Sequence, residues 1–298
     1  MTLSVLDMPF GCTSLVVGVT AGFLGLGAVA LVAWEVTGNI AWVENFFRVP
    51  GALLLVSLAA VELLLSLRVL HDFSPGQPMR KAWRLISFSA GLNLAGNVAA
   101  HILSIRSFVN PLVHFAWWPD SATSIREFGL ILSGTCRLAF LAAGLHWALR
   151  VYRQSGFLAR LARVDWILLA IVGAFVAREA GDVVVMLRHG AHPPPGVYLG
   201  WPVDPLLWLL LAEALLLNRS VRQMGQGWIG RCWKAFSTAI LLVVLGDLFI
   251  WATGFGHLPW IWNTLEWYIW LPAAGAFALA PAYQLEAVGY AERARQVG

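Results

Sequence analysis

Apolar stretches of membrane-spanning length recur along the whole chain and leave little else between them. Each is about 20 residues long and therefore crosses a hydrocarbon core of about 30 Å as an α-helix. A segment in lipid must satisfy its own backbone hydrogen bonds, which favours helices. The sequence therefore predicts an all-α, polytopic membrane protein with eight transmembrane helices, over residues 11–34, 50–70, 83–105, 127–149, 165–187, 204–220, 230–253 and 263–285.

The composition excludes a sizeable soluble domain. Charged residues make up 12% of the 298 residues and hydrophobic residues 59%, whereas a soluble domain carries roughly 25% charged residues. The polar intervals between the apolar stretches are at most about 20 residues long. We therefore expect residues 1–298 to form a single transmembrane domain, with the lipid bilayer as its partner and the bacterial inner membrane as its location.

Lysine and arginine residues are distributed unevenly between the two ends of the predicted helices. Fourteen lie in alternate loops and in the C-terminal tail, and four lie in the loops on the opposite side. Cytoplasmic loops of membrane proteins carry the excess of positive charge. Both termini are therefore predicted to be cytoplasmic. The net charge of +4 has the same origin, so we expect no nucleic-acid partner.

A polar stripe runs through the third apolar stretch. Ser89, Asn93, Asn97 and His101 recur every four residues, which places them on one face of a helix. Hydrocarbon offers these side chains no hydrogen-bond partner. The stripe is therefore expected to face other helices or a water-filled cavity.

Three pairs of predicted helices resemble one another: spans 2–3, 4–5 and 6–7. The second helix of each pair carries glycine followed by an amide or an acid, at Gly96-Asn97, Gly181-Asp182 and Gly246-Asp247. The pattern indicates a parallel repeat of two-helix hairpins. A ring of such hairpins would place the three amide or acid side chains at one depth, in the outer half of the membrane.

Ionisable side chains also lie within the predicted spans, where each charge costs about 2.5–3.5 kcal/mol on insertion scales. Arg137 requires an acid from another helix, and Glu62 or Glu213 lies near its depth. Arg178 and Asp182 are four residues apart and can pair within one helix. Two interpretations stay open: a closed network that fixes helix packing, or a hydrated site whose acids titrate or bind a cation.

The acids in the spans outnumber the two arginines, which favours the hydrated site. Trp251 lies near these acids and offers a cation–π contact. The candidate ligand-binding or ion-coupling residues are Glu62, Asn93, Asn97, His101, Arg137, Arg178, Asp182, Glu213, Asp247 and Trp251. Asp204 is set apart, because Asp204-Pro205 is typical of an N-cap followed by proline at the first helical position.

The predicted function is a transporter or ligand-binding membrane module for a small polar or cationic solute, with an acidic pocket that opens to the outer face. One alternative is a sensor or scaffold subunit that acts through a protein partner or as a homo-oligomer. Another is a redox subunit with b-type haem, which is disfavoured because His101 and His146 are predicted at different depths. The sequence has no P-loop, HExxH or GxSxG motif, so nothing indicates an enzyme, a cofactor or a metal site.

Overall fold

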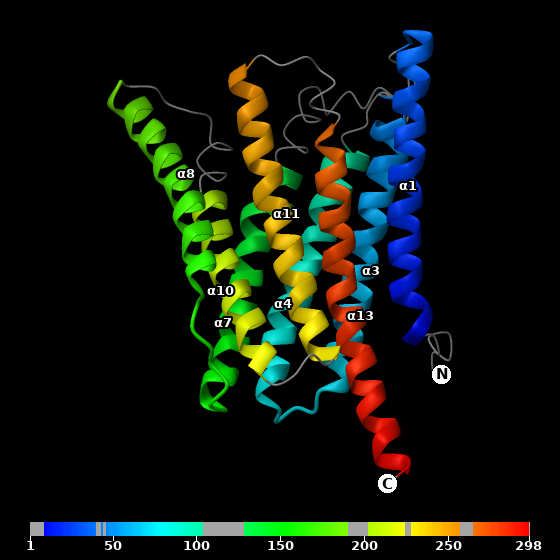
Figure 1. Ribbon diagram of the computed structural model, residues 1–298, viewed down its shortest axis with the longest axis vertical. Helices are drawn as coiled ribbons and strands as arrows, with labels where there is room; N and C mark the ends of the chain where they lie inside the picture. The colour runs from blue at the N-terminus through cyan, green and yellow to red at the C-terminus, as the bar shows by residue number, and fades with distance from the viewer. Residues whose placement is uncertain are drawn as a thin grey trace, which may run out of the picture.

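The computed structural model describes residues 9–39, 43, 46–103, 128–189, 202–223, 228–256 and 265–297. Long α-helices run alongside one another in these parts of the chain (Figure 1). They are α1 (Pro9–Thr37), α3 (Ala52–Asp72), α4 (Pro78–Asn97), α7 (Arg137–Gln154), α8 (Arg163–Arg188), α10 (Val203–Gln223), α11 (Trp228–Gly256) and α13 (Trp267–Val297). Each helix overlaps one of the predicted spans, so the all-α prediction is confirmed for the described residues.

Five of the described stretches are long and apolar enough to cross a membrane. They are Thr13–Thr37, Val49–Asp72, Pro78–Ile102, Phe128–Gln154 and Ile229–Phe249. The helices α8, α10 and α13 are not among these five stretches. The chain is therefore a multi-pass helical membrane protein. Its orientation across the membrane stays a prediction.

The order of the helices in space differs from their order along the chain. α4 packs against α3 and α7, and α11 packs against α10 and α13. α1 lies against α13 at one edge of the bundle, and α8 lies against α10 at the opposite edge (Figure 1). The start of α1 and the end of α13 lie at the same end of the bundle in Figure 1.

The predicted hairpin repeat has uneven support in the packing. α3–α4 and α10–α11 are packed neighbours, whereas α7 makes its main contacts with α4 and α10, and α8 with α10. The glycines of the repeat also differ in their surroundings. A Cβ at Gly96 would lie 2.5 Å from the backbone oxygen of Gly129, whereas one at Gly181 would have no neighbour within 4 Å. The repeat stays a prediction.

An aromatic core joins α4, α7 and α11. The buried rings of Trp83 and Trp233 lie 6.4 Å apart between centroids, and Phe236 lies 5.7 Å from Trp233. The indole Nε1 of Trp233 donates a hydrogen bond of 2.9 Å to the hydroxyl of Tyr152. Buried indoles usually have such a partner. The hydrogen bond fixes α7 and α11 relative to one another, and α4 joins the core by apolar burial.

Two π-helical turns lie where α4 and α7 approach each other. The turn η3 (Val98–Leu103) continues α4, and η4 (Leu132–Cys136) leads into α7. The two segments approach most closely at Gly96 and Ser133. A Cβ at Gly96 would lie only 2.5 Å from the backbone nitrogen of Ser133. Glycine at such a crossing lets two helix backbones approach closely in a membrane.

A charged contact ties α8 to α10 at the end that the charge pattern places at the inner membrane surface. Arg219 donates two hydrogen bonds to Asp165, from Nε at 2.9 Å and from Nη2 at 3.0 Å. Asp165 also accepts a hydrogen bond of 2.8 Å from the backbone N–H of Ala162. The hydrogen bonds from Arg219 hold the pKa of Asp165 below its usual range.

We expect Asp165→Asn to lower the free energy of unfolding by about 1 kcal/mol, because the bidentate pair is lost but the arginine is partly exposed. The lowered pKa means that this stabilisation is complete above the unfolded-state pKa of about 3.9 and is lost as the pH falls through the folded-state value. Unfolding titrations of the protein in detergent at neutral and acidic pH measure both effects. If the effects of Asp165→Asn and Arg219→Gln on the free energy of unfolding are fully additive in the double variant, the contact between the two side chains contributes nothing to stability.

Candidate functional site

The polar stripe of α4 faces neighbouring helices. Ser89 donates a hydrogen bond of 2.9 Å from Oγ to the backbone oxygen of Arg137, and Asn93 donates one of 2.8 Å from Nδ2 to Oε2 of Glu62. Asn97 donates from Nδ2 to both Oδ1 and the backbone oxygen of Asn93, each at 2.8 Å. Ser89, Asn93 and Asn97 are all buried. Ser89 and Asn93 therefore contact α7 and α3, and Asn97 is bonded to Asn93 within α4.

Glu62 and Arg137 form an ion pair at the centre of these contacts. Nη2 of Arg137 lies 3.5 Å from Oε2 of Glu62, and Cζ of Arg137 lies 4.1 Å from the ring centroid of Phe277. The pair is buried, with Glu62 2% and Arg137 9% exposed. Of the two acids that the sequence offered to Arg137, the structure pairs it with Glu62. This group joins α3, α4, α7 and α13.

His101 follows Ser89, Asn93 and Asn97 along the chain, beyond the end of α4. It belongs to η3, and its ring centroid lies 6.1 Å from that of Trp267. Backbone hydrogen bonds in a π-helix span five residues instead of four. The four-residue spacing that aligns Ser89, Asn93 and Asn97 on one face therefore no longer holds at His101.

Glu213 lies in a different contact. Its Oε1 atom is 3.1 Å from Nδ1 of His146 on α7, and its Oε2 atom is buried without a hydrogen-bond partner in the described part of the chain. Glu213 is 5% exposed, whereas the side chain of His146 is 73% exposed. The two mid-membrane acids Glu62 and Glu213 thus have separate partners and belong to separate contacts.

Three further candidate residues lie on α8 and α11. Arg178 is exposed on α8. The side chains of Asp182 and Trp251 lie outside the described part of the structure. The predicted pairing of Arg178 with Asp182 and the proposed cation–π role of Trp251 therefore stay predictions.

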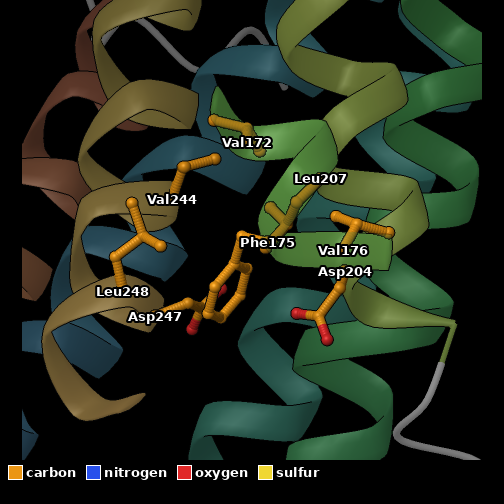
Figure 2. Close-up of a pocket in the computed structure, with 8 residues that line it drawn as sticks. All are labelled: Val172, Phe175, Val176, Asp204, Leu207, Val244, Asp247 and Leu248. Carbon is orange, nitrogen blue, oxygen red and sulfur yellow. The ribbon is translucent and has the colours of Figure 1, made fainter. Parts of the chain in front are cut away.

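Asp247 lines a pocket between α8, α10 and α11 (Figure 2). The Oδ2 atom of Asp247 is buried and has no hydrogen-bond partner among the described residues. Asp204, in the first turn of α10, contributes a second carboxylate. In the view of Figure 2 the ring of Phe175 stands between the two carboxylates. The other lining residues are apolar: Val172, Val176, Leu207, Val244 and Leu248.

The acids at this pocket lie close together. Asp204 and Asp247 are close enough to repel each other, and Glu179 on α8 adds a further repulsion on Asp204. Arg178 is not among the lining residues. A cation between the acids would relieve the repulsion and supply the missing partner of Asp247.

Sequence reasoning set Asp204 aside as a helix cap. The structure starts α10 at Val203, so Asp204 lies inside the first turn rather than before it. Phe175 gave no signal at all, because one phenylalanine among apolar residues is typical of a packed helix. Asp204 and Phe175 reach Asp247 because α10 packs against both α8 and α11. This packing is a tertiary feature.

Comparisons of the chain with protein-family models, curated proteins and solved structures found no match. The site therefore has to be interpreted from its own chemistry. Within the described residues, no group of three or more histidine, cysteine, aspartate or glutamate side chains is placed to hold a metal ion. The features that the structure does provide are an acidic, largely apolar pocket and a separate buried ion pair.

Proposed function

We propose that this protein is a transporter for a small cationic solute and that the pocket lined by Asp204 and Asp247 binds it. The observation that carries the proposal is the buried Oδ2 atom of Asp247, which lines the pocket without a hydrogen-bond partner in the described structure. Buried carboxylate oxygens are normally hydrogen-bonded or paired with a cation. Ionisable groups within membrane spans commonly mark substrate or ion pathways.

The separation of the charged groups supports the same interpretation. Glu62 is already paired with Arg137 and Asn93, and Glu213 contacts His146. Within the described residues, neither Asp247 nor Asp204 forms an ion pair with a cationic side chain, and the two acids repel each other. The Glu62–Arg137 pair is therefore assigned to packing, and the Asp204–Asp247 pocket to solute binding.

Uptake into proteoliposomes tests the proposal. Radiolabelled methylammonium is the probe, at mildly alkaline pH, where nearly all of it is still protonated and carboxyl groups are ionised. We expect uptake above that of protein-free liposomes, and a loss of about tenfold or more in Asp247→Asn, because one charge-assisted contact is removed. Asp182→Asn, in the matching position of the repeat, is tested alongside it.

Glu35→Gln is the matched control, because Glu35 is an exposed acid on α1 and does not line the pocket. It removes the same charge and is expected to leave uptake unchanged. Equal uptake by wild type and Asp247→Asn would exclude this acid from the mechanism. A wild type no faster than protein-free liposomes would contradict the transport of this class of solute.

A further inference from the structure

A strip of exposed side chains covers the side of the bundle where α4 and α7 pack together. Lys81, Arg84 and Phe88 are exposed on α4 at intervals of three and four residues, so they lie on one face of that helix. Phe140 is exposed on α7, and its ring centroid lies 4.5 Å from that of Phe88. Both rings belong to helices that are long and apolar enough to cross a membrane. The exposed rings therefore face lipid, and we call this surface the lipid-facing strip.

Two cations meet on one indole ring at the end of the lipid-facing strip. Nζ of Lys81 lies 3.7 Å from the ring centroid of Trp147, and Cζ of Arg150 lies 5.1 Å from the same centroid. The indole Nε1 donates a hydrogen bond of 3.1 Å to the backbone oxygen of Pro78, the first residue of α4. Neither Lys81 nor Arg150 forms an ion pair with an acid in the described part of the chain. Two positive charges are therefore held near one ring without a negative counterpart.

The spacing along the two helices matches the shape of a phospholipid. Phe88 lies seven residues from Lys81, and Phe140 lies seven residues from Trp147. At 1.5 Å per residue, both phenylalanine rings are about 10 Å further into the membrane than the charged end of the strip. Tryptophan is typical of the level of the headgroups. A lipid whose phosphate lies at that level and whose acyl chain runs inward meets the cations first and the rings next.

Arg84 lies between these two levels. It is exposed on the same face of α4 as Phe88 and forms no ion pair within the described residues. A charged side chain on a lipid-facing surface extends towards the headgroups, where its charge can be satisfied. Arg84 therefore adds a third positive charge to those of Lys81 and Arg150.

We propose that the lipid-facing strip binds an anionic phospholipid, with the phosphate at Lys81, Arg84 and Arg150 and one acyl chain against Phe88 and Phe140. Charge complementarity selects this occupant, because three cations without a paired acid favour a headgroup of net negative charge over a zwitterionic one. The rings contribute through apolar contact. The strip is a different surface from the acidic pocket, so the inference is independent of the proposed function.

Native mass spectrometry of the protein released from detergent micelles tests the proposal. The probes are phosphatidylglycerol and phosphatidylcholine with the same acyl chains, and inorganic phosphate. We expect phosphatidylglycerol to bind about tenfold or more tightly than phosphatidylcholine. Lys81→Gln combined with Arg150→Gln should weaken phosphatidylglycerol binding about tenfold or more and leave phosphatidylcholine binding nearly unchanged, because only the charge of the site is removed.

Arg160→Gln combined with Arg163→Gln is the matched control. It removes the same charge from two exposed positions, just before and at the start of α8, and is expected to leave phosphatidylglycerol binding unchanged. Phe88→Ala keeps all the charges and should weaken the binding of both phospholipids by a similar, smaller factor, because acyl-chain contact is lost. Circular dichroism and the melting temperature of each variant establish that it is folded.

Three results would overturn the proposal. The first is equal binding of the two phospholipids by the wild type, which needs no variant. The second is phosphatidylglycerol binding that is unchanged in the Lys81 and Arg150 double variant, or that falls equally in the control double variant. The third is displacement of phosphatidylglycerol by inorganic phosphate at equal concentration, since the cations would then bind a free anion rather than a lipid.

Discussion

Arg137→Met is expected to lower the free energy of unfolding by about 3–5 kcal/mol, because it leaves the buried carboxylate of Glu62 without its ion-pair partner. Methionine fills a similar volume and keeps an apolar contact with Phe277, so the loss comes from the charge rather than from a cavity. Titration with denaturing detergent, followed by circular dichroism, measures the change. Glu62→Gln is expected to destabilise by a similar amount, since it leaves a buried guanidinium uncompensated.

The double variant separates the ion pair from the other roles of these residues. Glu62→Leu combined with Arg137→Met removes both charges, and we expect it to be more stable than Arg137→Met alone, because no charge is left buried and unpaired. Arg153→Met, at an exposed position near the end of α7, is the control and should have little effect. If the effects of Glu62→Leu and Arg137→Met on the free energy of unfolding, each measured alone, simply add in the double variant, the contact at 3.5 Å does not couple the two residues.

Gly96→Ala is expected to destabilise the bundle by about 1–3 kcal/mol or more, the usual range for overpacking. The new Cβ would lie 2.5 Å from two backbone atoms, the oxygen of Gly129 and the nitrogen of Ser133. Backbone atoms cannot turn away as a flexible side chain can, so α4 and the segment before α7 have to separate. The melting temperature in detergent should fall accordingly.

Gly91→Ala is the matched control on the same helix. Its Cβ would meet only Cδ1 of Leu63, at 3.9 Å, and alanine has the higher helix propensity. We therefore expect Gly91→Ala to be neutral or slightly stabilising. Equal melting temperatures for the two variants would show that the close approach at Gly96 does not contribute to the packing.

The helices were predictable because a single physical constraint acts on every span. Hydrocarbon requires about 20 apolar residues and internally satisfied backbone groups, and both requirements are visible in the sequence. The ends were less predictable: α4 begins at Pro78 rather than at residue 83, and α13 continues to Val297 rather than ending at residue 285. Hydropathy marks where the lipid ends, whereas a helix continues into water.

The site was predictable only in part, because depth in the membrane does not determine which helices are neighbours. The position of Arg137 along its span identified Glu62 as a possible partner, and the structure supplies that contact. The pocket around Asp247 depends on Asp204 and on Phe175, which come from two other helices. The π-helical turn after Asn97 changes the residue spacing before His101, and a regular four-residue pattern in the sequence gives no indication of such a turn.

Infrared difference spectroscopy of the purified protein, with and without methylammonium, tests most directly whether the Asp204–Asp247 pocket holds a cation. A carboxylate that gains a charged hydrogen-bond donor changes its stretching bands. The predicted result is a carboxylate difference band in the wild type that is retained in Glu35→Gln and lost in Asp247→Asn. The same difference band in Asp247→Asn and in the wild type, or no band in the wild type, would contradict the assignment of this pocket as the cation site.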